Sequence, residues 1–554
     1  MTTVRWVLGA VWAVAGVAIS CAAAEPAAVS GASVSPLEVT IDQGPVRGVL
    51  RHGVVEFRGI PYAGSPAGAH RWAPTPPPPH WTAVRDASAF GPACPQTARF
   101  GLTEASDAED CLTINVSEPA DRKAGETLPV LFWIHGGAFL GGSANLYRLD
   151  ALARQRIVVV SANYRLGVFG FMAHPAFAAS DNGAFGLEDQ RAAMRWVQRN
   201  IAAFGGDPAN VTIAGESAGG GSVCQHLAAP ERVKGLFSKA IVQSAACMQP
   251  LPSVAQGGSL GIRISTDPIV HCGNDAHTLA CLRKAPLADL LEAGMTAAGA
   301  SVMSFGPTIG STVTPRAFAE AARTGDLVKV PLLLGGTRDE LRLYVGYDEQ
   351  AGRHVTHDNV LEHLRTMYEA TPAAQSAHAA EQIAREYDVA NAASVPATLG
   401  TIMSDYTPVV GINNCLYLKT AETYAQFSPT RVFEFADRDA PILGVGMPAH
   451  PDPGFEIGAG HSSELNYLFP NLSNTSRIDA PDLSPASQAL ADQMVVLWAN
   501  FMRSGVPSAA GVAAWPLYRG GPTAMLLDRG GPVLFDAAQR HKCGFWKSLY
   551  PQAL

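Results

Sequence analysis

The sequence predicts an α/β fold built around a buried, mostly parallel sheet. Residues 130–134 and the start of 157–171 are apolar runs typical of central parallel strands. Residues 186–208 carry apolar side chains near helical spacing, which predicts an amphipathic helix. A third apolar run, 211–213, comes next. This strand–helix–strand order indicates an α/β sheet.

A sharp strand-to-helix turn is predicted by the stretch VTIAGESAGGGSV, residues 211–223. Its β-branched start suits the end of a strand, and its small residues suit the opening of a helix. Gly215 and Gly219 flank Ser217 in the pattern G-x-S-x-G, the nucleophile elbow, a strained turn that places a hydroxyl above the sheet. The alternative is a glycine-rich turn with an incidental serine. The rest of the chain has to decide between them.

A glycine-rich loop follows an earlier predicted strand. The segment LPVLFWIHGGAFLGGSA begins at Leu128, and its apolar run ends in the turn from His135 to Ala138. Such a loop can aim backbone N–H groups at a developing oxyanion, together with the N–H of Ala218, the residue after Ser217. The alternative is a tight turn with no chemical role. The elbow downstream of the loop strengthens the chemical interpretation.

A serine hydroxyl needs a histidine to accept its proton and a carboxylate to orient that histidine. The chain has 15 histidines, so a single histidine proves nothing. In the order Ser…acid…His, the partners lie downstream of Ser217. Asp339 and Glu340 come just beyond the apolar run 331–334, and His461 lies in a glycine-rich loop near the C-terminus. The residues alone leave open which of the two carboxylates is the partner.

Composition and charge exclude several classes of protein. The 554 residues are 47% hydrophobic and 16% charged, enough to bury a large core. The net charge is −8 and no Lys/Arg cluster stands out, which argues against a nucleic-acid partner and against an anionic membrane surface.

The N-terminus predicts export. Arg5 precedes an apolar stretch, 6–19, which is followed by the small residues of a cleavage signal ending at Ala24. The stretch is too short for a transmembrane span. We therefore expect a signal peptide over 1–24 and a secreted or periplasmic protein. The alternative is a lipoprotein signal, with Cys21 as the site of a lipid anchor.

These residues resemble the type-B carboxylesterase and cholinesterase family of α/β-hydrolases over nearly the whole mature chain. The resemblance implies a single α/β-hydrolase domain over 25–554, with an antiparallel N-terminal portion of the sheet and helices on both faces. The motifs that carry it, in the family's order, are FRGIPYAGSPAG, HRWAPTPPPPHW, EDCLTINV, HGGAF, NYRLGVFGF, FGGDPANVTIAGESAGGGSV, TRDE and HSSELNYLF.

The resemblance also assigns roles. It implies that Ser217 is the acyl-forming nucleophile, His461 the general base and acid, and Glu340, rather than its neighbour Asp339, the orienting carboxylate. The oxyanion-hole N–H groups it implies are those of Gly137, Ala138 and Ala218. No metal or organic cofactor is implied.

Cysteine usage agrees with export, because eight cysteines remain once Cys21 is removed. Two of them, Cys224 and Cys247, have no counterpart in the family, so they either pair or stay free. By resemblance the other six form Cys94–Cys111, Cys272–Cys281 and Cys415–Cys543.

The chain departs from the family pattern at several places. Ser462 stands where many members have glycine after the histidine, and Leu341 where many have glycine after the acid. The loop between Cys94 and Cys111 holds no tryptophan, the residue with which cholinesterases bind a quaternary ammonium. A choline ester is therefore not the expected substrate.

We expect an exported serine carboxylic-ester hydrolase that acts on neutral small-molecule esters with water as co-substrate, as a monomer or homodimer. Two alternatives stay open. The same residues could serve a specialised ester, such as a toxin, drug, lipid or polymer. A non-catalytic binding protein on the same fold is the second, and the intact Ser217, Glu340 and His461 count against it.

Overall fold

The computed structural model describes residues 36–98, 105–299, 304–370, 378–442, 452–470 and 482–554. The expected signal peptide, 1–24, and the candidate lipid site Cys21 lie outside these residues.

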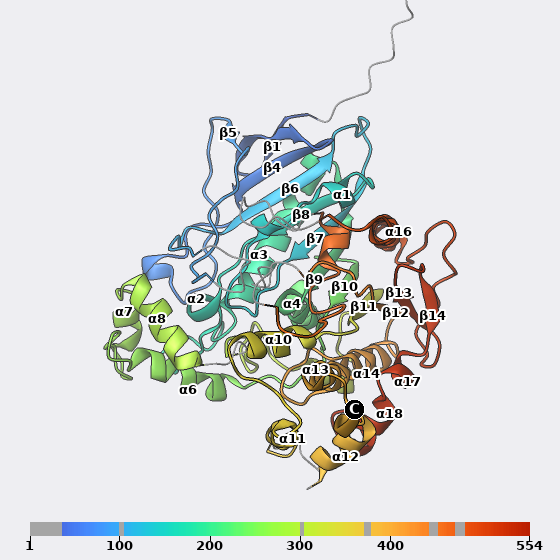
Figure 1. Ribbon diagram of the computed structural model, residues 1–554. Helices are drawn as coiled ribbons and strands as arrows, with labels where there is room; N and C mark the ends of the chain where they lie inside the picture. Colours follow the sequence, from blue (N-terminus) through green and yellow to red (C-terminus); the bar gives the residue numbers. More distant parts are fainter. Residues whose placement is uncertain (1–35, 99–104, 300–303, 371–377, 443–451, 471–481) are drawn as a thin grey trace, which may run out of the picture.

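A mixed sheet of 11 strands organises the fold (Figure 1). Its middle strand is β9 (Gly206–Glu216), which runs parallel to β7 (Leu128–Ile134) on one side and to β10 (Lys239–Gln243) on the other. The sheet order is β14 (Val533–Phe535), β13 (Ala524–Leu527), β12 (Thr430–Phe435), β11 (Leu332–Thr337), β10, β9, β7, β8 (Val158–Ala162), β6 (Thr113–Pro119), β4 (Val54–Pro61), β3 (Val49–Arg51).

Strand direction divides this sheet into two portions. From β8 to β13 every neighbouring pair is parallel. The N-terminal strands β6, β4 and β3 are antiparallel to their neighbours, and β14 is antiparallel to β13. The predicted fold class is therefore confirmed. A separate small sheet consists of β1 (Glu38–Ile41), β2 (Gly44–Arg47) and β5 (Arg85–Asp86).

Both faces of the sheet are buried, which explains why its strands are continuous apolar runs. In β7, Phe132 joins the core on one face and Trp133 the core on the other, as the alternation of side chains along a strand requires. Helices cover both faces (Figure 1). On the face of Phe132 lie α3 (Phe185–Asn200), α4 (Ala218–Leu227) and α14 (Asn414–Tyr424); on the face of Trp133 lie α1 (Asp150–Ala153) and α16 (Pro485–Ser504).

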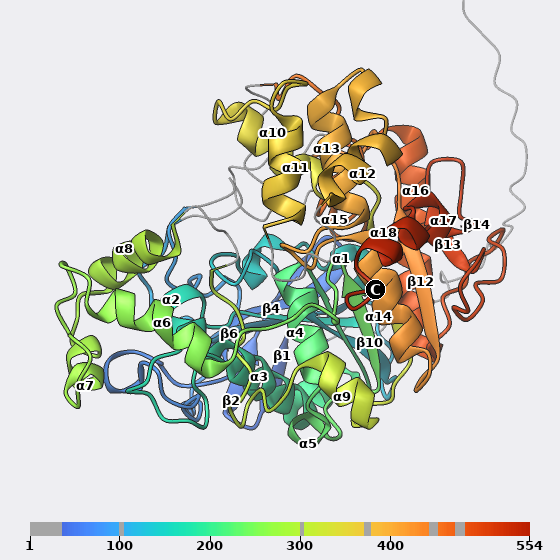
Figure 2. The same ribbon diagram turned by 90° about the horizontal axis from the view of Figure 1, so that it is seen from below.

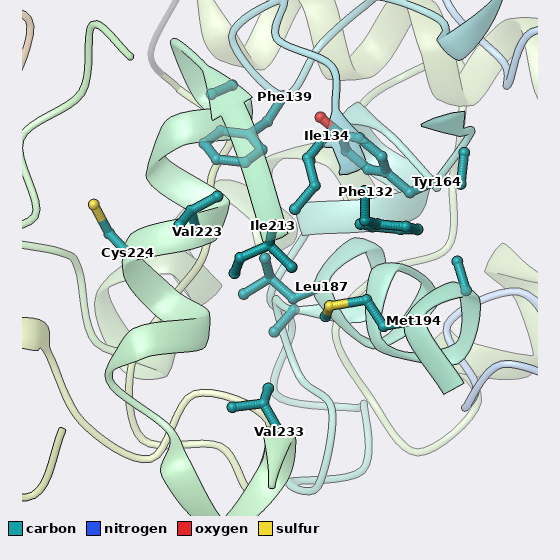
Figure 3. Packing of buried hydrophobic residues seen from close by; sticks show 14 of the residues in the cluster. Phe132, Ile134, Phe139, Tyr164, Leu187, Met194, Ile213, Val223, Cys224 and Val233 are labelled. Atoms are coloured by element: carbon teal, nitrogen blue, oxygen red, sulfur yellow. The ribbon is translucent and has the colours of Figure 1, made fainter. Parts of the chain in front are cut away.

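The first of these cores holds the elbow in place. Figure 3 shows Ile213 of β9 next to Val223 of α4, with Leu187 and Met194 of α3 on the neighbouring side. All four side chains are buried. Because β9 and α4 both pack into one apolar cluster, the turn between them is fixed in space.

Two groups of helices stand away from the sheet (Figures 1 and 2). One is α6 (Val254–Ser265), α7 (Thr278–Leu282) and α8 (Leu287–Ala298); the other is α10 (Arg342–Gln350), α11 (Val360–Tyr368), α12 (Ala379–Glu386) and α13 (Val395–Asp405). The remaining helices are short: α2 (Gly167–Phe171), α5 (Pro230–Val233), α9 (Phe318–Thr324), α15 (Leu465–Leu468), α17 (Ala537–Arg540), α18 (Cys543–Leu549), and the 3₁₀ helices η1 (Gly68–His70), η2 (Ala144–Leu146), η3 (Ile201–Phe204), η4 (Val389–Asn391).

Disulfides join segments that are distant in the sequence. Cys224 of α4 and Cys247, beyond the end of β10, are bonded to each other, so this pair is not free. The other bonds are Cys94–Cys111, Cys272–Cys281 and Cys415–Cys543.

A buried ion-pair cluster holds the C-terminal segment beside the last of these disulfides. His541 contacts Asp405 through Nδ1 and Glu434 of β12 through Nε2, each at 2.6 Å. Burial alone would lower the pKa of His541, but the Glu434 and Asp405 carboxylates raise it to about 10. The imidazole is therefore a cation between two anions.

Within the described ranges, no helix is long and apolar enough to cross a membrane.

Candidate active site

Ser217 occupies a strained position between β9 and α4. Its backbone has φ 55° and ψ −122°, a region that side-chain-bearing residues rarely adopt. The turn is so tight that a Cβ at Gly215 would lie 2.5 Å from the carbonyl oxygen of Gly219. A Cβ at Gly219 would overlap the carbonyl of Ile134 in β7. Glycine at these two positions is therefore a steric requirement, which explains the G-x-S-x-G pattern.

The structure brings Ser217, His461 and Glu340 together in one line of hydrogen bonds. Nε2 of His461 lies 2.9 Å from Oγ of Ser217, and Nδ1 lies 2.7 Å from Oε2 of Glu340. The three residues come from three segments: the elbow, the turn after β11 and the loop before α15. Their side chains are 121 residues or more apart in the sequence at each contact, so only the fold can align them.

Glu340 is held in a single orientation. Its Oε1 accepts hydrogen bonds from the backbone N–H of Thr337 and from the hydroxyl of Tyr417, both at 2.9 Å. Oε2 is left for His461. Although burial alone would raise the pKa of Glu340, His461 and the Thr337 N–H lower it. The carboxyl group is thus ionised and directed at the imidazole.

Asp339, the neighbouring carboxylate, points to a different partner. Arg438 binds it in a bidentate manner, with N–O distances of 2.9 and 3.0 Å. Asp339 also accepts a hydrogen bond from the backbone N–H of Ala459, in the loop that carries His461. The geometry therefore separates the two candidates: Glu340 contacts the imidazole, and Asp339 anchors the loop beside it.

The glycine-rich loop lies directly against the elbow. A Cβ at Gly136 would lie 3.2 Å from Cβ of Ser217. Gly137, Ala138 and the next residue all have positive φ, between 56° and 111°, which curls the backbone around this point. In the described part of the chain, the N–H groups of Gly137, Ala138 and Ala218 donate no hydrogen bond. Three unpartnered donors close to one hydroxyl can bind a developing oxyanion.

Electrostatics distinguish His461 from the histidine of the glycine-rich loop. Burial alone would lower the pKa of His461, but Glu216 and Glu340 raise it to about 9. His135 has no such partner: burial lowers its pKa to about 4, and its ring stacks on Tyr164 with centroids 4.3 Å apart. Of the two, only His461 is placed to exchange a proton with Ser217.

Sequence reasoning missed a set of buried polar residues around His461. Glu216, the last residue of β9, lies with Oε1 3.3 Å from Nε2 of His461 and accepts a hydrogen bond from Ser462. Glu464 accepts one from Gln243, and burial together with its acidic neighbours raises its pKa to about 8. Their positions in the sequence, next to Ser217 for Glu216 and three residues after His461 for Glu464, were the available signal. A charged residue near a motif is ordinarily exposed to solvent, so this position alone does not predict a role in the site.

An open pocket of about 380 Å³ lies beside the glycine-rich loop. Phe139 lines it together with Gly221 of α4, which is one helical turn after Ser217. Its wall is mixed: Phe171, Leu251 and Phe305 supply apolar surface, and the other lining residues include Gln225, Gln249 and Arg263. Nowhere among the described residues are three or more His, Cys, Asp or Glu side chains grouped to hold a metal ion.

Comparison with known proteins shows the family. The profile of the carboxylesterase family matches residues 35–546. Para-nitrobenzyl esterase of Bacillus subtilis (strain 168) is 34% identical, over 87% of this chain and 92% of the relative. Fumonisin B1 esterase of Sphingopyxis macrogoltabida is 32% identical over 86% and 83%, and human cocaine esterase 30% over 94% and 93%.

Solved structures agree with the sequence comparison. A carboxylesterase of Geobacillus stearothermophilus superposes with a TM-score of 0.76 at 32% identity, over 92% of this chain and 99% of that one. A thermophilic para-nitrobenzyl esterase gives 0.74 at 30% identity over the same shares. The fold is that of the α/β-hydrolase esterases, and the chain belongs to the carboxylesterase family. It is a carboxylic-ester hydrolase with the serine mechanism characteristic of that family.

Proposed function

We propose that Ser217, His461 and Glu340 are the catalytic triad of this esterase. The observation that carries the proposal is the unbroken line of hydrogen bonds from Oγ of Ser217 through the imidazole to Glu340. His461 takes the proton of Ser217 as the hydroxyl attacks the ester carbonyl. Glu340 holds the tautomer with Nδ1–H and stabilises the imidazolium.

The reaction then proceeds through an acyl-enzyme. The N–H groups of Gly137, Ala138 and Ala218 stabilise the tetrahedral oxyanion, because they have no acceptor among the described residues and need no reorganisation. His461 gives its proton to the leaving alcohol. It then takes a proton from water as the water oxygen attacks the acyl carbonyl. When the bond between the acyl carbon and Oγ of Ser217 breaks, His461 gives this proton to Oγ, and the acid and free Ser217 are released.

The preferred substrates are neutral esters with short-to-medium acyl groups, including esters of bulky secondary and tertiary alcohols. Support comes from the pocket beside the glycine-rich loop, whose wall carries Phe139, Phe171 and Phe305, and from Ala138, whose methyl group adds little bulk near the scissile carbonyl. A specialised ester is the second candidate, since relatives are named for fumonisin B1 and for cocaine.

A side-by-side measurement of kcat/KM for p-nitrophenyl butyrate, a tert-butyl ester and acetylcholine tests this assignment. We expect acetylcholine to be the poorest of the three, because no tryptophan stands between Cys94 and Cys111 to bind its cation. Ser217→Ala and His461→Ala should each lower turnover by about a million-fold. Near-normal turnover by Ser217→Ala would overturn the triad, whereas preference for acetylcholine would overturn only the substrate class.

We also propose that the chain is exported and that 25–554 form one domain. Disulfides are typical of exported proteins, and the four bonds support this location. N-terminal sequencing of the exported protein should begin at Glu25. Metabolic labelling of Cys21 with a radioactive fatty acid would instead establish the lipoprotein alternative.

A further inference from the structure

Ser462 has a conformation and a contact that set it apart from the rest of the His461 loop. Its φ is 68°, in the left-handed region where a side chain is unfavourable and glycine is preferred. The residue is buried, and its hydroxyl donates a hydrogen bond of 2.7 Å to Oε1 of Glu216. A side chain retained at such a position points to a use for the hydroxyl.

Two oxygen atoms lie at the same edge of the His461 ring. Nε2 is 2.9 Å from Oγ of Ser217 and 3.3 Å from Oε1 of Glu216. The oxygen of Glu216 that contacts His461 is also the one that accepts from Ser462. Ser462 therefore acts on the carboxylate at the atom that faces the imidazole.

We propose that Ser462 is a positioning residue: its hydroxyl keeps the Glu216 carboxylate in place beside Nε2 of His461, where this carboxylate stabilises the imidazolium formed when Ser217 loses its proton. The inference rests on the proposed triad and adds to it. Glu340 stabilises the imidazolium at Nδ1, and Glu216 stabilises the same cation at the opposite nitrogen.

The hydroxyl matters because Glu216 is completely enclosed. Burial raises the pKa of Glu216, while His461 and the Ser462 hydrogen bond lower it. Without the hydroxyl, the carboxyl group takes up a proton more readily and loses its charge. His461 then loses one of the negative neighbours that raise its pKa.

The other ionisable groups around this pair come from several elements. Glu340 and Glu464 are the acidic neighbours of both His461 and Glu216. Tyr147, Tyr344 of α10 and Tyr417 of α14 also face Glu216, and burial raises the pKa of each, so they are neutral. None of these groups supplies a cation, which leaves His461 as the positive partner of Glu216.

The test compares Ser462→Ala and Ser462→Gly with the wild type in kcat and kcat/KM for p-nitrophenyl butyrate across pH. Both variants lack the hydroxyl, but only glycine relieves the backbone strain. Ser463→Ala is the matched control, because the Ser463 hydroxyl is buried beside Ser462 and has no hydrogen-bond partner among the described residues. Titration of active sites with an organophosphate corrects every rate for folded enzyme.

We expect both Ser462 variants to move the acidic limb of kcat/KM to lower pH by about one unit, since His461 loses a nearby negative charge. At the pH plateau, kcat should fall about tenfold while KM is unchanged. A tenfold change corresponds to a loss of about one pKa unit of interaction between Glu216 and the imidazolium of His461. Ser463→Ala should leave the limb in place. In a Glu216→Gln background, Ser462→Ala should cause no further shift.

Rates that fall equally at every pH, with the limb unmoved, would overturn the inference and leave Ser462 a purely structural role. A shift that persists in the Glu216→Gln background would also overturn it. Failure of the proposed triad would be recognised separately, because Ser217→Ala would then keep near-normal turnover of the ester.

Discussion

Replacing Glu340 with glutamine gives the sharpest prediction about the site, because it changes one atom of the hydrogen-bonded line. The amide oxygen can still accept from Thr337 and Tyr417, which bind Oε1 of Glu340. The amide NH₂ then faces Nδ1 of His461, where Oε2 lay at 2.7 Å. An NH₂ group donates, so Nδ1 must accept, and the ring proton moves to Nε2.

The expected loss follows from this change of tautomer. A proton on Nε2 points at Ser217, and the imidazole can no longer accept the proton of the hydroxyl. In the Ser-His-Asp template, the equivalent carboxylate-to-amide change lowers kcat by about 10⁴. That factor corresponds to about 5 kcal/mol of transition-state stabilisation. We expect a similar loss for Glu340→Gln.

The pH dependence should change in a defined direction. His461 must be neutral to act as a base, and its pKa is raised to about 9, so wild-type kcat/KM should rise with pH toward about 9. Glu340 is one of the carboxylates that raise this pKa. Its removal should move the acidic limb to lower pH by about one unit or more.

The assay is p-nitrophenyl butyrate hydrolysis followed in a pH-stat, which avoids the titration of the released phenol. Asp339→Asn is the matched control: it removes the adjacent carboxylate, whose partners include Arg438, Arg342 and the Ala459 N–H but not His461. This variant should lose thermal stability but keep the acidic limb in place. If Asp339→Asn moved the limb and Glu340→Gln did not, the assignment of the carboxylate would be refuted.

Two predictions concern stability and one concerns the glycine-rich loop. Cys415–Cys543 closes a loop across a sequence separation of 128, so the double serine variant should lose about 5 kcal/mol in denaturant unfolding; an unchanged midpoint would contradict this. His541→Ala should cost about 3 kcal/mol, because it removes the cation between the buried carboxylates of Asp405 and Glu434. Asp405 then keeps the Tyr387 hydroxyl, and Glu434 keeps Arg540. The pKa of His541 is raised to about 10 in the folded protein, from the value of 6.5 expected in the unfolded chain. The stabilisation of the folded state by its charge is therefore complete below about pH 6.5 and is lost as pH rises toward 10. Calorimetry from pH 7 to 10 should therefore show a wild-type decline that His541→Ala lacks. Ala138→Gly should keep ester turnover while relieving the positive φ of 56°; a loss of turnover above tenfold would contradict the view that this residue acts through its N–H.

Much of the elbow could be predicted because steric demands there are local. Gly215 and Gly219 are fixed by the approach of strand and helix backbones within a few residues of Ser217. The parallel strands could also be predicted from the sequence, because a strand that is buried on both faces is a continuous apolar run. Sequence signals of this kind depend on neighbours along the chain.

Contacts between segments that are distant in the sequence could not be predicted from the residues alone. Asp339 and Glu340 are adjacent, and their different partners depend on Arg438, which is 99 residues from Asp339. Cys224 can bond to Cys247 because α4 lies beside the segment that follows β10 in the folded chain. The role of Glu216 depends on its hydrogen bond with Ser462, a residue 246 positions away, so the motif around Ser217 does not predict it.

The most direct test of the account is to locate the acylated residue. The purified enzyme is treated with a diethyl phosphoryl organophosphate, digested and mapped by mass spectrometry, with Ser217→Ala as the control. The account predicts one phosphorylated peptide, which contains Ser217, loss of ester turnover in proportion to labelling, and no adduct in the variant. An adduct on another residue, or stoichiometric labelling of Ser217→Ala together with inactivation, would contradict the assignment of Ser217 as the nucleophile.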